Sequence, residues 1–111
     1  MLQAVRQTSK ERNWEKHHTP KNLAMDLVRE ASEALEHFVW ATNEEIKKDK
    51  KRIKKIQDEL GDVLHSMLLL ADVLKIDLPK SFWQKLEKVK KRYPADKVYG
   101  QTGYEYKNRR N

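Results

Sequence analysis

The sequence predicts an all-α protein whose subunit is a four-helix antiparallel bundle. Charged residues make up 37% of its 111 residues, and there are only three glycines and three prolines, a poor supply of the turn residues that β-hairpins require. Apolar residues also recur at helical spacing over long blocks. A chain of this length forms one domain, which we assign to residues 1–100, followed by a basic, flexible tail at 101–111.

Three prolines, Pro20, Pro79 and Pro94, divide the chain into four helical blocks, because proline is tolerated in the first turn of a helix and breaks its interior. The first block, 2–14, is largely polar. The second, 21–41, follows a Thr19-Pro20 pair that suits an N-cap and the first helical position. Its main apolar residues form one stripe, namely Leu23, Leu27, Ala34 and Phe38.

The third block, 44–74, is predicted as one long helix. Its apolar residues between Ile46 and Leu74 repeat mostly at intervals of three and four, as in a heptad seam. The first half is surrounded by charge and is expected to project into solvent, whereas the second half is apolar on most sides and central. The fourth block, 79–92, has the same helical spacing, and the chain beyond residue 97 is expected to fray.

The net charge of +7 is concentrated in two segments, the lysine-rich connector at 44–55 and the C-terminal stretch at 88–111. A basic surface can attract nucleic acid, membrane phosphates or a polyphosphate substrate, and charge alone does not choose among them. It is equally consistent with a solvated surface that only keeps the protein in solution.

The chain has no cysteine, which excludes disulfides, thiolate metal sites and a cysteine nucleophile and favours a reducing compartment. Its longest near-apolar run, 63–71, is far shorter than the roughly 20 residues that span a bilayer. The N-terminal residues lack the apolar segment of a signal peptide. We therefore expect a cytoplasmic protein that does not associate with membranes.

Four acidic residues border apolar stripes instead of lying opposite them. Glu30 and Glu33 flank the stripe of the second block, and Glu59 and Asp62 flank that of the third. If these helices pack antiparallel, four carboxylates converge, and their repulsion raises their pKa values unless a cation neutralises them. An all-oxygen set suits Mg²⁺ or Mn²⁺ better than Zn²⁺. Ordinary surface acids show the same spacing, so spacing alone leaves both interpretations open.

The pattern Glu30-x-x-Glu33, followed after 25 residues by Glu59-x-x-Asp62, resembles the acidic signature of the MazG-like, all-α nucleoside triphosphate pyrophosphohydrolases. Flanking segments look like the dCTP pyrophosphatase branch of that family. They are residues 13–14, 18–22, 27–36, 38–40, 58–64, 76–79 and 85–94.

The resemblance implies hydrolysis of a nucleoside triphosphate, a pyrimidine deoxynucleotide such as dCTP or a modified form, to the monophosphate and pyrophosphate, in nucleotide-pool sanitation. It implies that Glu30, Glu33, Glu59 and Asp62 are catalytic residues that hold Mg²⁺, or Mn²⁺, because carboxylates bind a triphosphate only through such ions. One of these acids, or Glu36, would take the proton of the attacking water.

The resemblance also suggests residues for the nucleotide. Trp14 and Trp40 offer flat surfaces on which a base could stack, although tryptophan is more often a core residue. Basic residues near the end of the fourth block would face the triphosphate, although a helix C-terminus favours such residues without any ligand. The substrate-binding candidates are Trp14, His18, Asn22, Trp40, Ser66, Lys91, Arg92 and Tyr93.

Two departures from the dCTP-type pattern fall on the base side of the expected pocket. Ser66 stands where relatives often have an aromatic residue, and Val89 stands where many have asparagine. The base pocket is therefore expected to be roomy and to offer few hydrogen-bonding groups, which predicts activity on more than one pyrimidine deoxynucleotide.

The alternative function is a basic helical module that binds nucleic acid through residues 47–55 and the tail. Such a module has no need for acids beside a core face, so nucleic acid is not the expected partner. A structural helical oligomer with a degenerate site is a further alternative. The chain's nine aromatic residues exceed what one small subunit buries, which predicts a homo-oligomer. The resemblance suggests a tetramer, built as a dimer of dimers, with sites near subunit boundaries.

Overall fold

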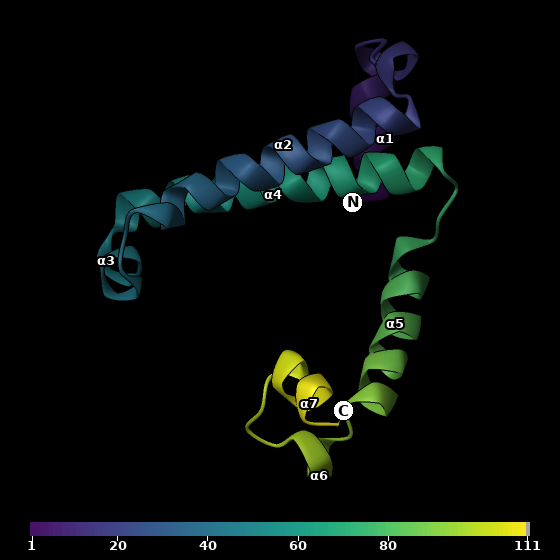
Figure 1. Ribbon diagram of the computed structural model, residues 1–111. Helices are drawn as coiled ribbons and strands as arrows, with labels where there is room; N and C mark the ends of the chain where they lie inside the picture. The colour runs from purple at the N-terminus through teal and green to yellow at the C-terminus, as the bar shows by residue number, and fades with distance from the viewer. Residues whose placement is uncertain (111) are drawn as a thin grey trace. The chain divides into compact units, whose positions relative to one another are not determined.

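The computed structural model describes residues 1–110 of the chain, and over these residues the regular structure is helical (Figure 1). The elements divide between two compact units, one formed by residues 1–76 and one that starts at Asp77, and each is described by itself. In chain order the elements are α1 (Leu2–Glu11), η1 (Glu15–His17), α2 (Pro20–Val39), α3 (Asn43–Lys48), α4 (Lys50–Val73), α5 (Leu78–Arg92), α6 (Ala95–Val98) and α7 (Gly103–Arg110).

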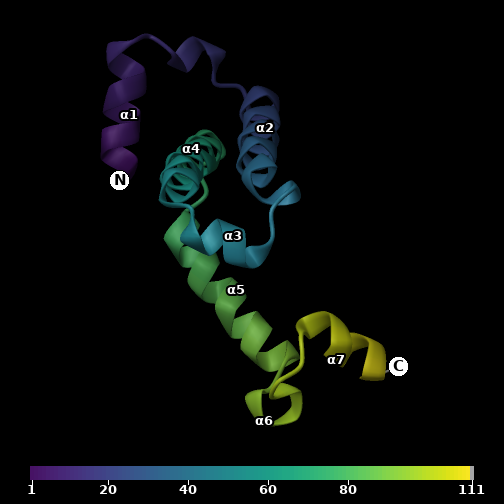
Figure 2. The same cartoon turned by 90° about the vertical axis from the view of Figure 1, so that its left-hand side faces the viewer.

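The first unit is built on an antiparallel pair, α2 and α4, which lie side by side along their lengths (Figure 1). On its other side α4 is contacted by α1 (Figure 2). An ion pair holds α1 to α4, with Nε of Arg6 3.0 Å from Oδ1 of Asp72. The antiparallel pairing confirms the arrangement on which the predicted convergence of acidic residues depends.

Few residues of this unit are buried, and most of those have small side chains. Leu23 and Ala34 of α2 pack against α4, whose Ala71 and Ser66 are also buried. Small residues at these positions let the two helices approach closely. Within the described residues, no helix is long and apolar enough to cross a membrane.

Side-chain caps explain where the helices begin. Thr19 accepts a hydrogen bond from the backbone N–H of Asn22, with Pro20 at the first helical position, as the sequence predicts. Asp49 caps α4 by accepting from the backbone N–H of Arg52 at 3.0 Å, and Asp77 caps α5 in the same way. Each cap satisfies one of the N–H groups that a helix start leaves without a partner.

Two predicted helix boundaries were wrong. The third block is not one helix, because Asp49 adopts an extended conformation that ends α3 and at the same time caps α4. The first block ends at Glu11 instead of residue 14, because Asn13 adopts a left-handed conformation with φ of 53° and the chain turns there. Asparagine tolerates this conformation better than most residues.

In the second unit, α5 matches the fourth predicted block, whereas the stretch beyond residue 97 is more regular than predicted. Residues 103–110 form α7, and the ring of Tyr93 stacks edge to face on that of Tyr106 at 5.8 Å between centroids. A Cβ at Gly103 would lie 3.2 Å from the Tyr93 ring, so glycine permits this close approach. The division at residue 100 and the flexibility of the tail stay predictions.

Candidate metal centre

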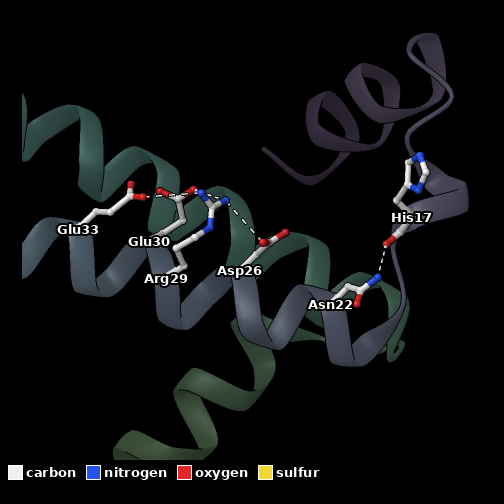
Figure 3. A network of polar contacts seen from close by, with 6 residues as sticks. All are labelled: His17, Asn22, Asp26, Arg29, Glu30 and Glu33. Atoms are coloured by element: carbon white, nitrogen blue, oxygen red, sulfur yellow. Dashed lines mark hydrogen bonds and ion pairs between the residues drawn. The ribbon is translucent and has the colours of Figure 1, made fainter.

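Three carboxylates from α2 and α4 meet where the two helices pack. Glu30 and Glu33 lie one turn apart on α2, and Glu59 faces them from α4, with one carboxylate oxygen of each within 4.8 Å of the others. Figure 3 shows Glu30 and Glu33 on the side of α2 that borders α4. The antiparallel pairing thus brings together residues that are 26 or more positions apart in the sequence.

Asp62 is the fourth predicted ligand, and the structure places it beside this cluster but not within it. Its side chain is exposed, yet its charge raises the pKa of Glu30. It lies one turn after Glu59 on α4, so a change of rotamer would turn it toward or away from the other three acids. The structure therefore brings together three of the four predicted carboxylates, Glu30, Glu33 and Glu59.

The environment of Glu30 is unfavourable for its negative charge. Burial is the main cause that raises the pKa of its carboxyl group, and the charges of Glu33, Asp62 and Glu59 raise it further, against the opposing effect of Arg29. Oε2 of Glu30 and Oε2 of Glu59 are buried without a hydrogen-bond partner among the described residues. Such oxygens are costly in a folded protein, and a cation bound between them would remove that cost.

Arg29 is the basic residue that contacts Glu30 and Glu33. Its guanidinium nitrogens lie 3.3 Å from Oε1 of Glu30, 3.5 Å from Oδ1 of Asp26 and 3.7 Å from Oε1 of Glu33 (Figure 3). The Arg29 side chain is 61% exposed. Because an exposed side chain moves at little cost, a divalent ion can displace it from the carboxylates.

His37 is a site residue that the sequence reasoning missed. Its Nε2 lies 3.9 Å from Oε1 of Glu59, and both side chains are mostly buried. It follows Glu33 by one helical turn on α2, and that spacing is the signal that could have placed it on the same face.

A cavity of about 460 Å³ lies at one end of the α2–α4 pair, and His37, which is 3.9 Å from Glu59, is one of its lining residues. The C-terminal end of α2 contributes Glu36, His37 and Trp40 to its walls, and the start of α4 contributes Arg52 and Lys55. Trp40 is therefore beside a cavity, as expected of a residue that stacks on a ligand. Arg52 and Lys55 were not among the predicted substrate residues, because the sequence shows them only as part of a lysine-rich segment.

The other predicted nucleotide residues of the first unit lie at the opposite end of α2. Asn22 serves the helix start, because its Nδ2 donates to the carbonyl oxygen of His17 at 3.3 Å (Figure 3), and His18 caps the 3-10 helix just before it. Arg12 forms a cation–π contact with Trp14, because its Cζ lies 5.6 Å from the centroid of the indole ring. Ser66 is buried inside the unit.

The length of α2 prevents these groups from forming one pocket within a single chain. Asn22 and Trp40 are 18 residues apart, which along a helix is about 27 Å. Lys91, Arg92 and Tyr93 belong to the second unit, where Arg92 stacks on the ring of Tyr93. The structure therefore does not gather the predicted substrate residues, and their roles stay predictions.

Comparison with known proteins identifies the family of this helical pair. The profile of the MazG-like family matches residues 28–107, a stretch that includes all four acids of the signature and the walls of the cavity. The chain belongs to the MazG-like family.

Relatives of this MazG-like chain include mammalian enzymes. It is 38% identical over 88 residues to dCTP pyrophosphatase 1 of Homo sapiens and 36% identical over 88 residues to dCTP pyrophosphatase 1 of Bos taurus. Each match covers 77% of this chain and 52% of the relative, so the chain spans about half the length of the curated relatives it matches.

A solved structure shares the fold. The crystal structure of a pyrophosphatase from Archaeoglobus fulgidus DSM 4304 matches with a TM-score of 0.76 and 37% sequence identity, over 84% of this chain and 88% of that chain. The all-α fold predicted from the sequence is confirmed.

The donor atoms of this MazG-like chain fit a hard divalent cation. The three clustered side chains offer carboxylate oxygens alone, the donors that Mg²⁺ and Mn²⁺ prefer. Two carboxylate oxygens of these residues, Oε2 of Glu30 and Oε2 of Glu59, are buried and lack a partner within the described residues. Both the type of donor atom and the unsatisfied oxygens therefore indicate a cation site.

Proposed function

We propose that this chain hydrolyses a nucleoside triphosphate to the monophosphate and pyrophosphate, using a divalent cation held by Glu30, Glu33 and Glu59. The observation that carries the proposal is the cluster of these carboxylates with its two buried, unpartnered oxygens. The printed names of the mammalian relatives support a pyrimidine deoxynucleotide such as dCTP, or a modified form, as the substrate, and nucleotide-pool sanitation as the role.

The acids act through the ion and not on the phosphates directly. A carboxylate repels a triphosphate, so Glu30, Glu33 and Glu59 serve as ligands, with Asp62 as the fourth when its side chain turns inward. A bound Mg²⁺, or Mn²⁺, supplies charge neutralisation at the phosphates and acidifies water. The water oxygen bonds to phosphorus, the bond between the α- and β-phosphates breaks, and pyrophosphate leaves. A carboxylate of the cluster or Glu36 takes the proton.

The cavity at the end of the α2–α4 pair suits the nucleoside part of the substrate. Trp40 offers an indole ring at its wall, and stacking on an aromatic ring is worth about 1–3 kcal/mol per base. The separation of Trp14, His18 and Asn22 from Trp40 along α2 favours a site that is completed by a second copy of the chain. We therefore extend the proposal to a homo-oligomer, a tetramer built as a dimer of dimers, and to a location in the cytoplasm.

Substitution of Glu59 by glutamine tests the proposed reaction. Glu59→Gln keeps the shape of the side chain and removes one charge from the cluster, so we expect at least about tenfold slower pyrophosphate release from dCTP and weaker Mg²⁺ binding by calorimetry. Glu45→Gln is the matched control, because Glu45 is an exposed acid on α3 outside the cluster, and it should behave as wild type. Full activity in Glu59→Gln would contradict the assignment of the site.

A further inference from the structure

The cavity at the end of the α2–α4 pair has a cationic side as well as an aromatic one. Trp40 and Ala41 line it from the end of α2, and Lys51, Arg52 and Lys55 line it from the first two turns of α4. Its volume of about 460 Å³ lies in the range of small-molecule sites. Neither Lys51 nor Lys55 forms an ion pair among the described side chains.

Arg52 has a donor that the chain itself does not satisfy. Its Nε lies 3.6 Å from Oδ2 of Asp49, and that contact, with the cap at its backbone N–H, fixes the start of the side chain. Nη1 is buried and has no hydrogen-bond partner in the part of the chain that the structure describes. Buried guanidinium nitrogens are normally paired. Arg52 also lines the cavity, and its side chain is 31% exposed, so its guanidinium group can offer a donor to an acceptor atom on a bound molecule.

Helix geometry places this donor at a defined distance from the carboxylates. Arg52 precedes Glu59 by seven residues on α4, and Trp40 follows Glu33 by seven residues on α2, which in each case is about 10 Å along the helix. Because the helices are antiparallel, both displacements point to the same end of the pair. A nucleotide whose phosphates lie at the carboxylates, and that extends toward this end, places its base at the cavity.

We propose that Arg52 determines base specificity, by donating a hydrogen bond from its guanidinium group to a carbonyl oxygen or ring nitrogen of a base stacked on Trp40. This inference rests on the proposed function and adds to it a residue that reads the base. It revises the expectation of a pocket with few hydrogen-bonding groups, since polar side chains line the cavity together with the exposed Trp40. A base that lacks the acceptor leaves the guanidinium unpaired and is rejected.

The test compares a nucleotide with the same molecule lacking its base. Arg52→Met keeps the length of the side chain and the backbone N–H that Asp49 caps, and removes the charge and the donors. We expect kcat/KM for dCTP to fall about tenfold, mainly through KM, while kcat/KM for 2-deoxyribose 5-triphosphate stays unchanged. Arg52→Lys should lie between wild type and Arg52→Met. Lys54→Met is the matched control, an exposed cation on α4 outside the cavity, and should change neither substrate.

The outcomes separate this inference from its competitors. An equal fall for both substrates would show that Arg52 contacts phosphate and would overturn the proposal, and so would unchanged kinetics for both. If circular dichroism shows that Arg52→Met is unfolded, the same comparison of the two substrates is made with Arg52→Lys, which keeps the charge.

A binding measurement judges the inference independently of catalysis. With Mg²⁺ present, dCMP should quench the fluorescence of Trp40 in the full chain, and Arg52→Met should weaken dCMP binding about tenfold while leaving the binding of inorganic pyrophosphate unchanged. Trp40→Phe identifies the signal. If the wild type releases no pyrophosphate from any nucleotide, the proposed function fails, whereas equal weakening of dCMP and pyrophosphate binding overturns the role of Arg52.

Discussion

Glu30 is the residue at which the energetic cost of the carboxylate cluster is concentrated. Its pKa is raised, chiefly by burial and then by the neighbouring acids, so the folded chain holds a proton there more tightly than the unfolded chain does. The associated stability is fully present below the ordinary value of 4.5 and is lost as pH rises through the raised folded pKa. At neutral pH without metal, the charge of Glu30 therefore opposes folding.

Glu30→Gln should relieve this repulsion. In EDTA at neutral pH we expect the melting temperature to rise by about 4 °C, the shift that corresponds to about 1 kcal/mol in a domain of this size. Below pH 4.5 the gain should vanish, because wild-type Glu30 is protonated there. Added Mg²⁺ should stabilise the wild type more than the variant. Thermal melts at several pH values measure all three effects, and a variant less stable than wild type in EDTA would contradict the account.

At the scale of the elements, the start of α4 determines the cationic wall of the cavity. Asp49 ends α3, caps α4 and contacts Arg52, so it fixes where α4 begins and holds Arg52 at the cavity. The positions of the later residues of α4, Glu59 included, then follow from the regular rise of the helix.

Asp49→Ala should therefore destabilise the fold and loosen the cavity. Loss of an N-cap costs about 1 kcal/mol, which chemical denaturation measures directly. The KM for dCTP should rise, while Mg²⁺ binding should change little, because Glu59 lies nearly three turns further along α4. Thr42→Ala removes the cap of α3 and is the control, which should lower stability without raising KM. Equal effects on KM would show that Asp49 acts only through stability.

The elements that sequence patterns predict well here are those with a local cause. The Thr19-Pro20 cap and the apolar stripes of α2 and α4 are encoded within a few turns, and the acid pairs follow from i,i+3 spacing. The break at Asp49 was missed because the apolar spacing continues across it. Arg52 and His37 were missed because their roles arise only when α2 and α4 pack. Asp62 lies outside the cluster, although its i,i+3 spacing from Glu59 puts it on the same flank of the helix, because spacing does not determine where a side chain points.

At the scale of the whole molecule, the first unit leaves much apolar surface uncovered. On α2 one exposed stripe contains Met25, Val28, Leu35 and Val39, and on α4 another contains Ile53, Leu60, Leu64 and Leu74. Each set lies on one face of its helix. Stripes of this extent are typical of surfaces that another helix or another chain covers.

The proposed homo-oligomer predicts that the chain migrates as a multimer. Light scattering coupled to size exclusion should give the mass of a tetramer at micromolar concentration. Leu35→Lys places a charge in the middle of the α2 stripe, where Leu35 is 59% exposed, and should shift the mass toward smaller species with the helical content retained. A monomeric wild type would contradict the proposed assembly.

The central claim is that the carboxylates of α2 and α4 hydrolyse a nucleotide with the help of a divalent ion. The most direct test follows the products of dCTP and of the other canonical nucleoside triphosphates by chromatography while Mg²⁺ is titrated into the metal-free chain. The account predicts equal amounts of monophosphate and pyrophosphate, a rate that rises with Mg²⁺ and falls to background in EDTA, and near-background release by Glu59→Gln. Turnover that EDTA leaves unchanged, or products that are the diphosphate and inorganic phosphate, would contradict it.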